Sequence, residues 1–233
     1  MLSILMIVYN ANPVMSEMTK EAVDFIVRNT VGEYELILLK NGGAVLDWTI
    51  YERGVKSGLQ LSTDNGNRLG LAEAYNRAAS SARGDIICIL HNDALVPAGW
   101  NIPLMEAAKG GAIAFPMVDE SWSNCESRGI PKTKEWQTTG ACFVLSRETW
   151  DRLGGYDEEF KGYHWEDTDL FYRAMQHGIR LVRCPVTVVH HRGATRTFTR
   201  PEDHRYFEKN MEYYKQKHGH ISLLTMSVSP QEV

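Results

Sequence analysis

A chain of 233 residues with 43% hydrophobic and 23% charged residues can bury a full core and has the composition of an ordinary globular protein. Its net charge of −4 argues against broad, sequence-independent binding to nucleic acids or anionic membranes. The four cysteines are scattered without a C-x-x-C pair, which argues against a zinc ribbon or a disulfide scaffold and suits a reducing compartment.

The N-terminal stretch Leu2–Val8 is apolar but short, and it lacks a basic leader and a cleavage site. A buried first strand explains it better than a signal peptide does. No apolar run approaches the roughly 18 residues of a membrane-spanning helix. We therefore expect a soluble, cytoplasmic protein without stable membrane insertion.

Strand and helix signals alternate through the first half of the chain. Short apolar runs predict buried parallel strands at Ile4–Val8, Glu35–Leu39 and Ile86–Leu90. Between them, helices are predicted over Ser16–Arg28 and Leu71–Ala82. This alternation predicts an α/β fold with an open, mostly parallel sheet flanked by helices. Ligands of such sheets bind beyond the carboxyl ends of the strands.

The second half of the chain is less regular. Apolar runs and helical spacing predict further strands at Ala112–Phe115, Ala141–Leu145 and Leu181–Val189, a helix starting near Glu166, and a helix over Pro201–Lys217. A polar segment, Asp119–Gln137, separates the first two of these strands. Its length suggests a functional loop.

Two polar clusters follow predicted strands and suggest a metal site. His91-Asn92-Asp93 comes directly after Ile86–Leu90, and an acid in that place can ligate a divalent metal that also binds a phosphate. An Asx turn is the alternative. His190 and His191 end the last strand, and imidazole together with carboxylate suits a Mn²⁺-like ion. Because neighbouring strand residues face opposite ways, only one of these histidines can face the site.

An acidic cluster opens the predicted helix at residue 166. Carboxylates in a first helical turn lie near free N–H groups and the positive end of the helix dipole, which keeps them ionised. Asp167 is our candidate for a general base, with Glu166 and Asp169 as competitors. Neighbours on a helix lie about 100° apart, so the three do not share one face. A capping box with solvated acids is the alternative.

The order and spacing of these pieces resemble the family 2 glycosyltransferases of the GT-A fold, in particular their rhamnosyltransferase-like branch. The most specific match is Gly154–Phe160, which reads Gly-Gly-Tyr-Asp-Glu-x-Phe with Glu at x, followed by Glu166–Leu170, which reads Glu-Asp-x-Asp-Leu. The remaining matches are individually weak and lie at Leu5–Asn10, Asn76, Gly84-Asp85, His91–Asp93, Thr139–Cys142, Trp150–Leu153 and His190–Thr195. Together they cover roughly residues 3–215.

The resemblance implies a single GT-A domain over residues 1–233. Its parts would be a Rossmann-like nucleotide-sugar-binding half (1–95), an acceptor and catalytic half (96–200) and a C-terminal helical tail (201–233). The implied reaction moves a sugar, with inversion, from a nucleotide-diphosphate sugar (UDP- or dTDP-linked) to an acceptor hydroxyl, with Mn²⁺ or Mg²⁺ as cofactor. The acceptor stays open among a glycan, a protein, a lipid-linked molecule and a modified nucleic-acid base, and a homodimer stays open as well.

Site roles follow from the resemblance residue by residue. It assigns metal ligation to Asp93, His190 and His91, and the role of catalytic base to Asp167. The residues that it implies around the donor and its sugar are Tyr9, Asn10, Asn41, Asn76, His91, Asn92, Gly140, Trp165 and Glu166. Three tryptophans, Trp165, Trp122 and Trp136, are candidates for stacking on a sugar, with a core or rim position as the alternative.

Two residues depart from the family pattern. His91 stands where the family usually has the first aspartate of its D-x-D motif, so it could ligate the metal, bond the ribose or indicate a weakened dependence on metal. Lys40 stands where an aspartate commonly reads uracil, and lysine cannot accept that hydrogen bond. Asn41 is an alternative reader of the base, and Lys40 an alternative phosphate contact.

Two other classes compete with this interpretation. A nucleotidyltransferase shares the α/β layout and the metal-bound phosphates, but no Gly-rich loop with arginine and lysine follows the first strand. A non-catalytic nucleotide- or sugar-binding module would explain His91 and Lys40 as marks of lost activity. The pair Glu166-Asp167 together with His190 argues against that loss.

Overall fold

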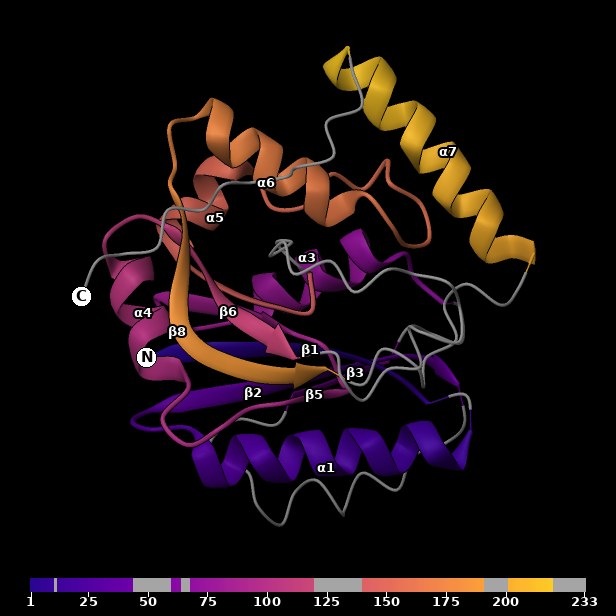
Figure 1. Ribbon diagram of the computed structural model, residues 1–233. Helices are drawn as coiled ribbons and strands as arrows, with labels where there is room; N and C mark the ends of the chain where they lie inside the picture. The colour runs from indigo at the N-terminus through magenta and orange to yellow at the C-terminus, as the bar shows by residue number, and fades with distance from the viewer. Residues whose placement is uncertain (11, 44–59, 64–67, 120–139, 191–200, 220–233) are drawn as a thin grey trace.

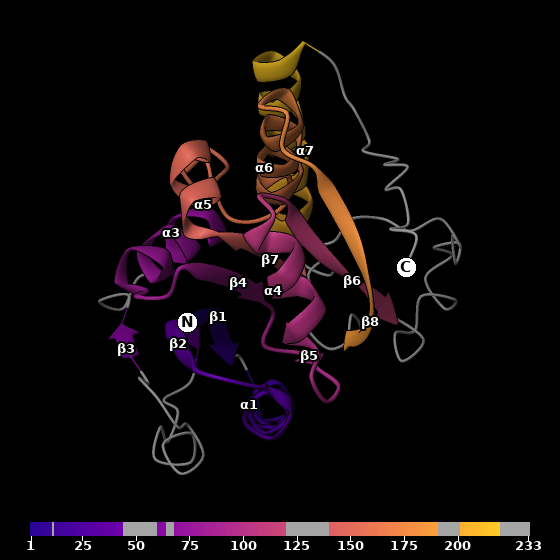
Figure 2. The same cartoon turned by 90° about the vertical axis from the view of Figure 1, so that its left-hand side faces the viewer.

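The fold is an α/β sheet covered by helices, seen from two sides in Figures 1 and 2. The computed structural model describes residues 1–10, 12–43, 60–63, 68–119, 140–190 and 201–219. Its elements, in chain order, are β1 (Leu2–Asn10), α1 (Pro13–Asn29), β2 (Tyr34–Gly43), β3 (Gln60–Thr63), α3 (Leu71–Ser81), β4 (Ile86–Leu90), β5 (Ala94–Leu95), α4 (Asn101–Lys109), β6 (Ile113–Asp119), β7 (Cys142–Ser146), α5 (Arg147–Leu153), α6 (Glu166–Gln176), β8 (Leu181–His190) and α7 (Pro201–His218).

One eight-stranded sheet has the strand order β3-β2-β1-β4-β7-β6-β8-β5. The pairs β1–β2, β1–β4, β2–β3 and β6–β8 are parallel. Strand β7 runs antiparallel to both β4 and β6, and β5 runs antiparallel to β8. The predicted α/β sheet flanked by helices is confirmed, with β7 as a reversed strand in its middle. Strands β1, β2, β3, β4, β6 and β8 therefore end at one edge, and β7 begins there.

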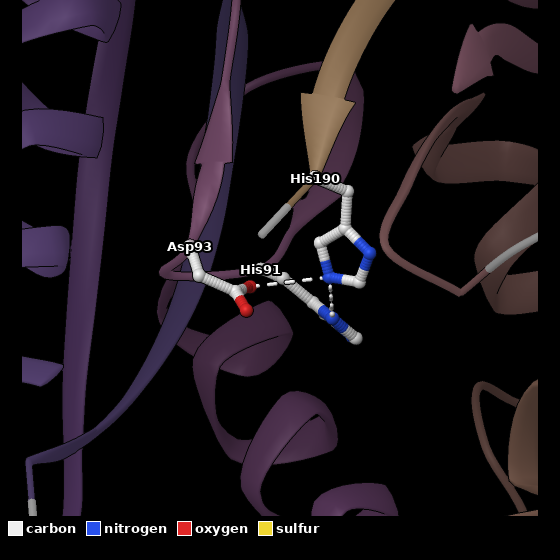
Figure 3. A group of neighbouring side chains, drawn as sticks. All are labelled: His91, Asp93 and His190. Carbon is white, nitrogen blue, oxygen red and sulfur yellow. Dashed lines mark hydrogen bonds and ion pairs between the residues drawn. The ribbon is translucent and has the colours of Figure 1, made fainter. Parts of the chain in front are cut away.

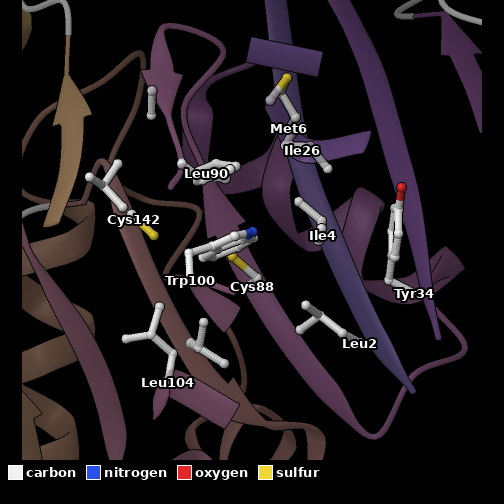
Figure 4. Close-up of a cluster of buried hydrophobic side chains, with 14 of the residues drawn as sticks. Leu2, Ile4, Met6, Ile26, Tyr34, Cys88, Leu90, Trp100, Leu104 and Cys142 are labelled. Carbon is white, nitrogen blue, oxygen red and sulfur yellow. The ribbon is translucent and has the colours of Figure 1, made fainter. Parts of the chain in front are cut away.

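Different helices cover the two faces of this sheet. Ile4 and Met6 of β1 pack with α1 and α4, whereas Leu5 and Ile7 pack with α3, α5 and α6. Figure 4 shows the first of these cores, in which the indole of Trp100 is fully buried. Burial on both faces explains why β1, β2 and β4 read as unbroken apolar runs.

The N-terminal helix starts earlier than its apolar spacing predicts. Asn12 caps α1 by accepting a hydrogen bond from the Met15 N–H at 3.0 Å, and Pro13 occupies the first turn, where its missing N–H costs nothing. The other predicted helices are confirmed as α3, α6 and α7. Four short or weakly patterned elements, β3, β5, α4 and α5, are not predicted by the sequence. A two-residue strand or a seven-residue helix offers too few positions to show a period.

Candidate active site

The strand directions bring three distant segments to one edge of the sheet. His91 follows β4, His190 ends β8, and Ala141 precedes β7, which pairs with β4. The N–H of His91 donates to the Ala141 carbonyl at 2.8 Å. The register between β5 and β8 sets Ala94 opposite His190, which places Asp93 next to that histidine.

His91, Asp93 and His190 form a compact cluster at this edge (Figure 3). The Nε2 atom of His190 lies 3.2 Å from Oδ1 of Asp93 and 3.4 Å from Nδ1 of His91. One ligand atom from each residue falls within 4.8 Å of the other two. The structure thus brings together the three residues predicted as metal ligands, although their role as ligands stays a prediction.

The carboxylate of Asp93 is buried beside two histidines. The residue is 2% exposed, and its Oδ1 forms an ion-pair contact of 3.2 Å with His190 Nε2. Burial raises the pKa of Asp93, but the adjacent imidazoles of His190 and His91 outweigh it, so the pKa lies below its usual value. A buried, ionised carboxylate is costly unless positive charge lies close to it.

The spacing of the cluster suits a divalent cation. Ligand atoms about 2.1 Å from one octahedral ion, and at right angles to each other, are about 3 Å apart. The 3.2 Å and 3.4 Å separations around His190 Nε2 are close to that value. Two imidazoles and one carboxylate form a mixed nitrogen and oxygen donor set, which fits Mn²⁺ better than Mg²⁺.

Asp167 of the acidic pair also lies next to the Gly140-Ala141 segment. Asp167 is partly exposed, and its Oδ1 accepts a hydrogen bond from the Thr168 N–H at 2.7 Å. Its Oδ2 is so close to Gly140 that a Cβ atom on that glycine would lie 2.6 Å away. Since Ala141 bonds His91, the carboxylate of Asp167 and the His-Asp-His cluster flank the same two residues.

The two acids at the start of α6 have unusual protonation. Burial, followed by the negative charge of Asp167, raises the pKa of Glu166 to about 8. Burial also raises the pKa of Asp167, against the hydrogen bonds that it accepts from Thr168 and Gly140. Glu166 is 8% exposed, and its Oε2 has no hydrogen-bond partner in the described chain. A carboxylate with a raised pKa is a better proton acceptor near neutral pH.

Asp169, the third acid of the cluster, is already engaged. Its side chain is fully buried, and its oxygens lie 2.7 Å from Arg173 Nε, Lys217 Nζ and His218 Nε2. The last two residues belong to α7. Asp169 therefore anchors the C-terminal helix, and Glu166 and Asp167 are left as the candidates for the base.

Several predicted donor-binding residues make hydrogen bonds within the fold. The Asn41 amide makes two hydrogen bonds to the Leu69 backbone, at 2.7 and 3.0 Å, and is buried. The Asn76 amide makes two to the Tyr156 backbone, both at 2.9 Å. Both amides therefore hold backbone segments together, and their contacts with the donor stay predictions. Asn92 donates to Thr19 Oγ1 at 2.9 Å, which ties it to α1.

Trp165 is also a structural residue. It is 7% exposed and packs against Phe207 and Tyr214 of α7, with ring centroids 5.7 and 5.2 Å apart. This packing fits the core position that was the alternative for Trp165, and its contact with a sugar stays a prediction. The side chains of Asn10, Trp122, Trp136 and His191 lie outside the described residues, as does most of the predicted loop Asp119–Gln137.

Tyr9 stands at the same edge, with a partner that the sequence analysis missed. The Arg68 guanidinium lies over the Tyr9 ring, with Cζ 4.1 Å from its centroid, and 5.4 Å from the centroid of Tyr163. Gly42 lies beside this pair, and its φ of 85° accounts for the glycine there. A lone arginine ahead of a helix gave no periodic signal by which to find it.

Comparison with known proteins identifies a family that matches this chain. The profile of "Glycosyl transferase family 2" matches residues 3–165. The uncharacterized protein Rv1525 of Mycobacterium tuberculosis is 26% identical over an alignment of 205 residues that covers 82% of this chain and 72% of that protein.

Two solved structures are similar in fold. GalNAc-T7, solved with UDP, GalNAc and Mn²⁺, has a TM-score of 0.65 at 19% identity, over 81% of this chain and 43% of that one. The mannosyltransferase PcManGT of Pyrobaculum calidifontis, solved with GDP-Man and Mn²⁺, has a TM-score of 0.60 at 20% identity, over 81% and 56%. This chain thus spans about half the length of the solved chains. Among the helices that the structure describes, none has the length and apolar character needed to cross a membrane.

Proposed function

Since this chain belongs to glycosyl transferase family 2 and is a glycosyltransferase, we propose that it transfers a sugar, with inversion, from a nucleotide-diphosphate sugar to an acceptor hydroxyl. The observation that carries this proposal is the buried Asp93 carboxylate grouped with two imidazoles, next to the Gly140-Ala141 segment that Asp167 also contacts. This arrangement provides a cation site and a proton acceptor at one edge of the sheet.

The cation would be held by His91, Asp93 and His190. When bound, it supplies positive charge for the negative charge that develops on the departing diphosphate. Mn²⁺ is our first choice, with Mg²⁺ as the alternative, because two of the three ligands are imidazoles. The Mn²⁺ of GalNAc-T7 and of PcManGT supports this choice by analogy.

Asp167 acts as the general base in this scheme. As the acceptor oxygen bonds to the anomeric carbon, the bond from that carbon to the diphosphate oxygen breaks, and the acceptor proton passes to Asp167. A single displacement from the opposite face inverts the anomeric centre. Glu166, with its pKa raised to about 8, keeps its proton near neutral pH, so the pair carries one negative charge rather than two.

The donor base is proposed as uracil or thymine, in the form of UDP or dTDP. Tyr9, stacked on Arg68 at the carboxyl end of β1, is the residue that we assign to the nucleotide. The two similar structures bind different bases, uracil and guanine, so the fold leaves the choice to side chains.

Thermal-shift binding tests the proposal directly. The chain would be heated with UDP, GDP, dTDP or CMP, each in Mn²⁺, Mg²⁺ or EDTA. We expect one nucleotide to raise the melting temperature only in the presence of metal. Asp93→Asn should abolish that shift, while the control Asp24→Asn, on the exposed face of α1, should keep it.

The outcomes are distinct. A shift followed by slow hydrolysis of the matching donor sugar supports the transferase. Binding without any hydrolysis favours the non-catalytic module, and no shift with any nucleotide refutes the donor site.

A further inference from the structure

One side chain of α7 makes three hydrogen-bond contacts with the segment that leads into the acidic pair. Asn210 is 3% exposed, and its Nδ2 lies 2.9, 3.1 and 2.9 Å from the carbonyl oxygens of Lys161, Tyr163 and His164. An amide nitrogen carries two hydrogens, so at least one of them is shared between two of these three carbonyls. Figure 1 shows α7 beside the segment that enters α6.

This segment has a backbone conformation that needs support. His164 and Trp165 have φ values of 80° and 74°, and in the described chain they are the non-glycine residues with positive φ. Such residues cost free energy and persist only where their surroundings fix them. Two consecutive ones directly before Glu166 mark the point where the chain turns into α6.

Packing from two sides fixes the same segment. Gly162 lies so close to α7 that a Cβ atom there would be 2.6 Å from the Tyr206 ring. On the other side, the Leu71 N–H at the start of α3 donates to the Gly162 carbonyl at 2.7 Å. Asn210 supplies the hydrogen bonds between these two contacts.

The turn controls the direction of the first turn of α6. The Trp165 carbonyl accepts the hydrogen bond of the Asp169 N–H at 2.9 Å, which makes Trp165 the start of the helix. Glu166 and Asp167 follow immediately, so a change at His164 or Trp165 rotates both carboxylates. The carboxylate of Asp167 has little room for such a change, because it already lies against Gly140.

We propose that Asn210 is a positioning residue for the acidic pair, acting through the carbonyls of Lys161, Tyr163 and His164. This inference rests on the proposed function of Asp167. It reaches beyond residues 3–165, where the family profile matches, and gives α7 a part in the reaction.

A second group of α7 residues anchors the helix elsewhere and provides a control. The Tyr213 hydroxyl donates to Asp157 Oδ2 at 2.9 Å, and Lys217 lies 2.7 Å from both Asp157 and Asp169. Tyr213→Phe removes one hydrogen bond that holds α7 and leaves the 161–165 segment unchanged.

The test compares Asn210→Ala, Asn210→Ser and Tyr213→Phe with the wild-type chain. Three quantities are measured: the melting temperature, Mn²⁺-dependent nucleotide affinity, and the turnover number for hydrolysis of the matching donor sugar, well below every melting temperature. We expect Asn210→Ala to lower turnover about 10- to 100-fold with nucleotide affinity unchanged. The turnover of Asn210→Ser, which keeps one donor, should lie between those of Asn210→Ala and the wild-type chain. Tyr213→Phe should keep turnover within about twofold of wild type.

A purely structural role of Asn210 gives a different result. The variants of Asn210 would then lose melting temperature like Tyr213→Phe but keep wild-type turnover at low temperature, which overturns the proposal. If Asn210→Ala does not fold, the melting temperature, nucleotide affinity and turnover of Asn210→Ser are compared with those of Tyr213→Phe and the wild-type chain, and that comparison decides between the two roles. Failure of the proposed function is recognised separately, because the wild-type chain would then show no metal-dependent nucleotide binding or no donor hydrolysis.

Discussion

Replacing Gly140 by alanine should displace the Asp167 carboxylate by a distance that follows from the contacts of the added Cβ atom. The added Cβ would lie 2.6 Å from Asp167 Oδ2, 3.2 Å from its Cγ and 3.3 Å from its Cβ, whereas ordinary contact begins at 3.4 Å. The carboxylate must therefore move by about 0.8 Å. Gly140 has an ordinary φ, so alanine adds no backbone strain. A misplacement of about 1 Å costs about 100-fold in rate, or about 2.7 kcal/mol of barrier.

The assay is donor hydrolysis, with nucleotide binding as the companion measurement. We expect Gly140→Ala to lower the turnover number about 100-fold and to leave Mn²⁺-dependent nucleotide affinity unchanged. Gly110→Ala, at the end of α4, is the control, because its Cβ would meet the Ala107 carbonyl at 3.3 Å and touches no candidate site residue. Turnover within threefold of wild type would show that Asp167 is not the base.

Three further predictions concern the cation and the acidic pair. Asp93→Asn should weaken Mn²⁺-dependent nucleotide binding more than about 100-fold by calorimetry, and unchanged binding would remove Asp93 from the ligands. His91→Asp should raise Mg²⁺ affinity relative to Mn²⁺, since oxygen ligands suit Mg²⁺; an unchanged ratio would place His91 outside the ligand set. Glu166 has a pKa of about 8 in the folded chain against an ordinary 4.5, so stability should fall as pH rises between these values. Glu166→Gln lacks that loss, and its advantage in melting temperature should grow from about pH 5 to 8; a constant difference would contradict the raised pKa.

The sheet and the grouping of His91, Asp93 and His190 could be predicted from the sequence for a physical reason. Buried strands are continuous apolar runs, and the polar residues that follow such runs come together when parallel strands end at one edge. His91, Asp93 and His190 could be selected in this way although 99 residues separate the two histidines.

The role of each polar side chain within the site was harder to predict from the sequence. Asn41, Asn76 and Asp169 have the residue types of ligand contacts, but whether an amide or a carboxylate faces a ligand or a backbone depends on partners distant in sequence. Asp169, for example, meets Lys217 and His218 of α7. No local pattern indicates such pairings, and the same holds for Asn210, which acts on carbonyl groups 46 to 49 residues away.

Strand β5 joins the sheet through two residue pairs, Ala94 with His190 and Leu95 with Val189. Segments with so few hydrogen bonds open locally far more often than a whole domain unfolds. Asp93 directly precedes this short ladder and His190 belongs to it, so an ion shared by their side chains would hold the edge closed. The amide protons of Ala94 and Leu95 would then exchange with solvent more slowly in the presence of metal. Their exchange rates would therefore report whether an ion is bound.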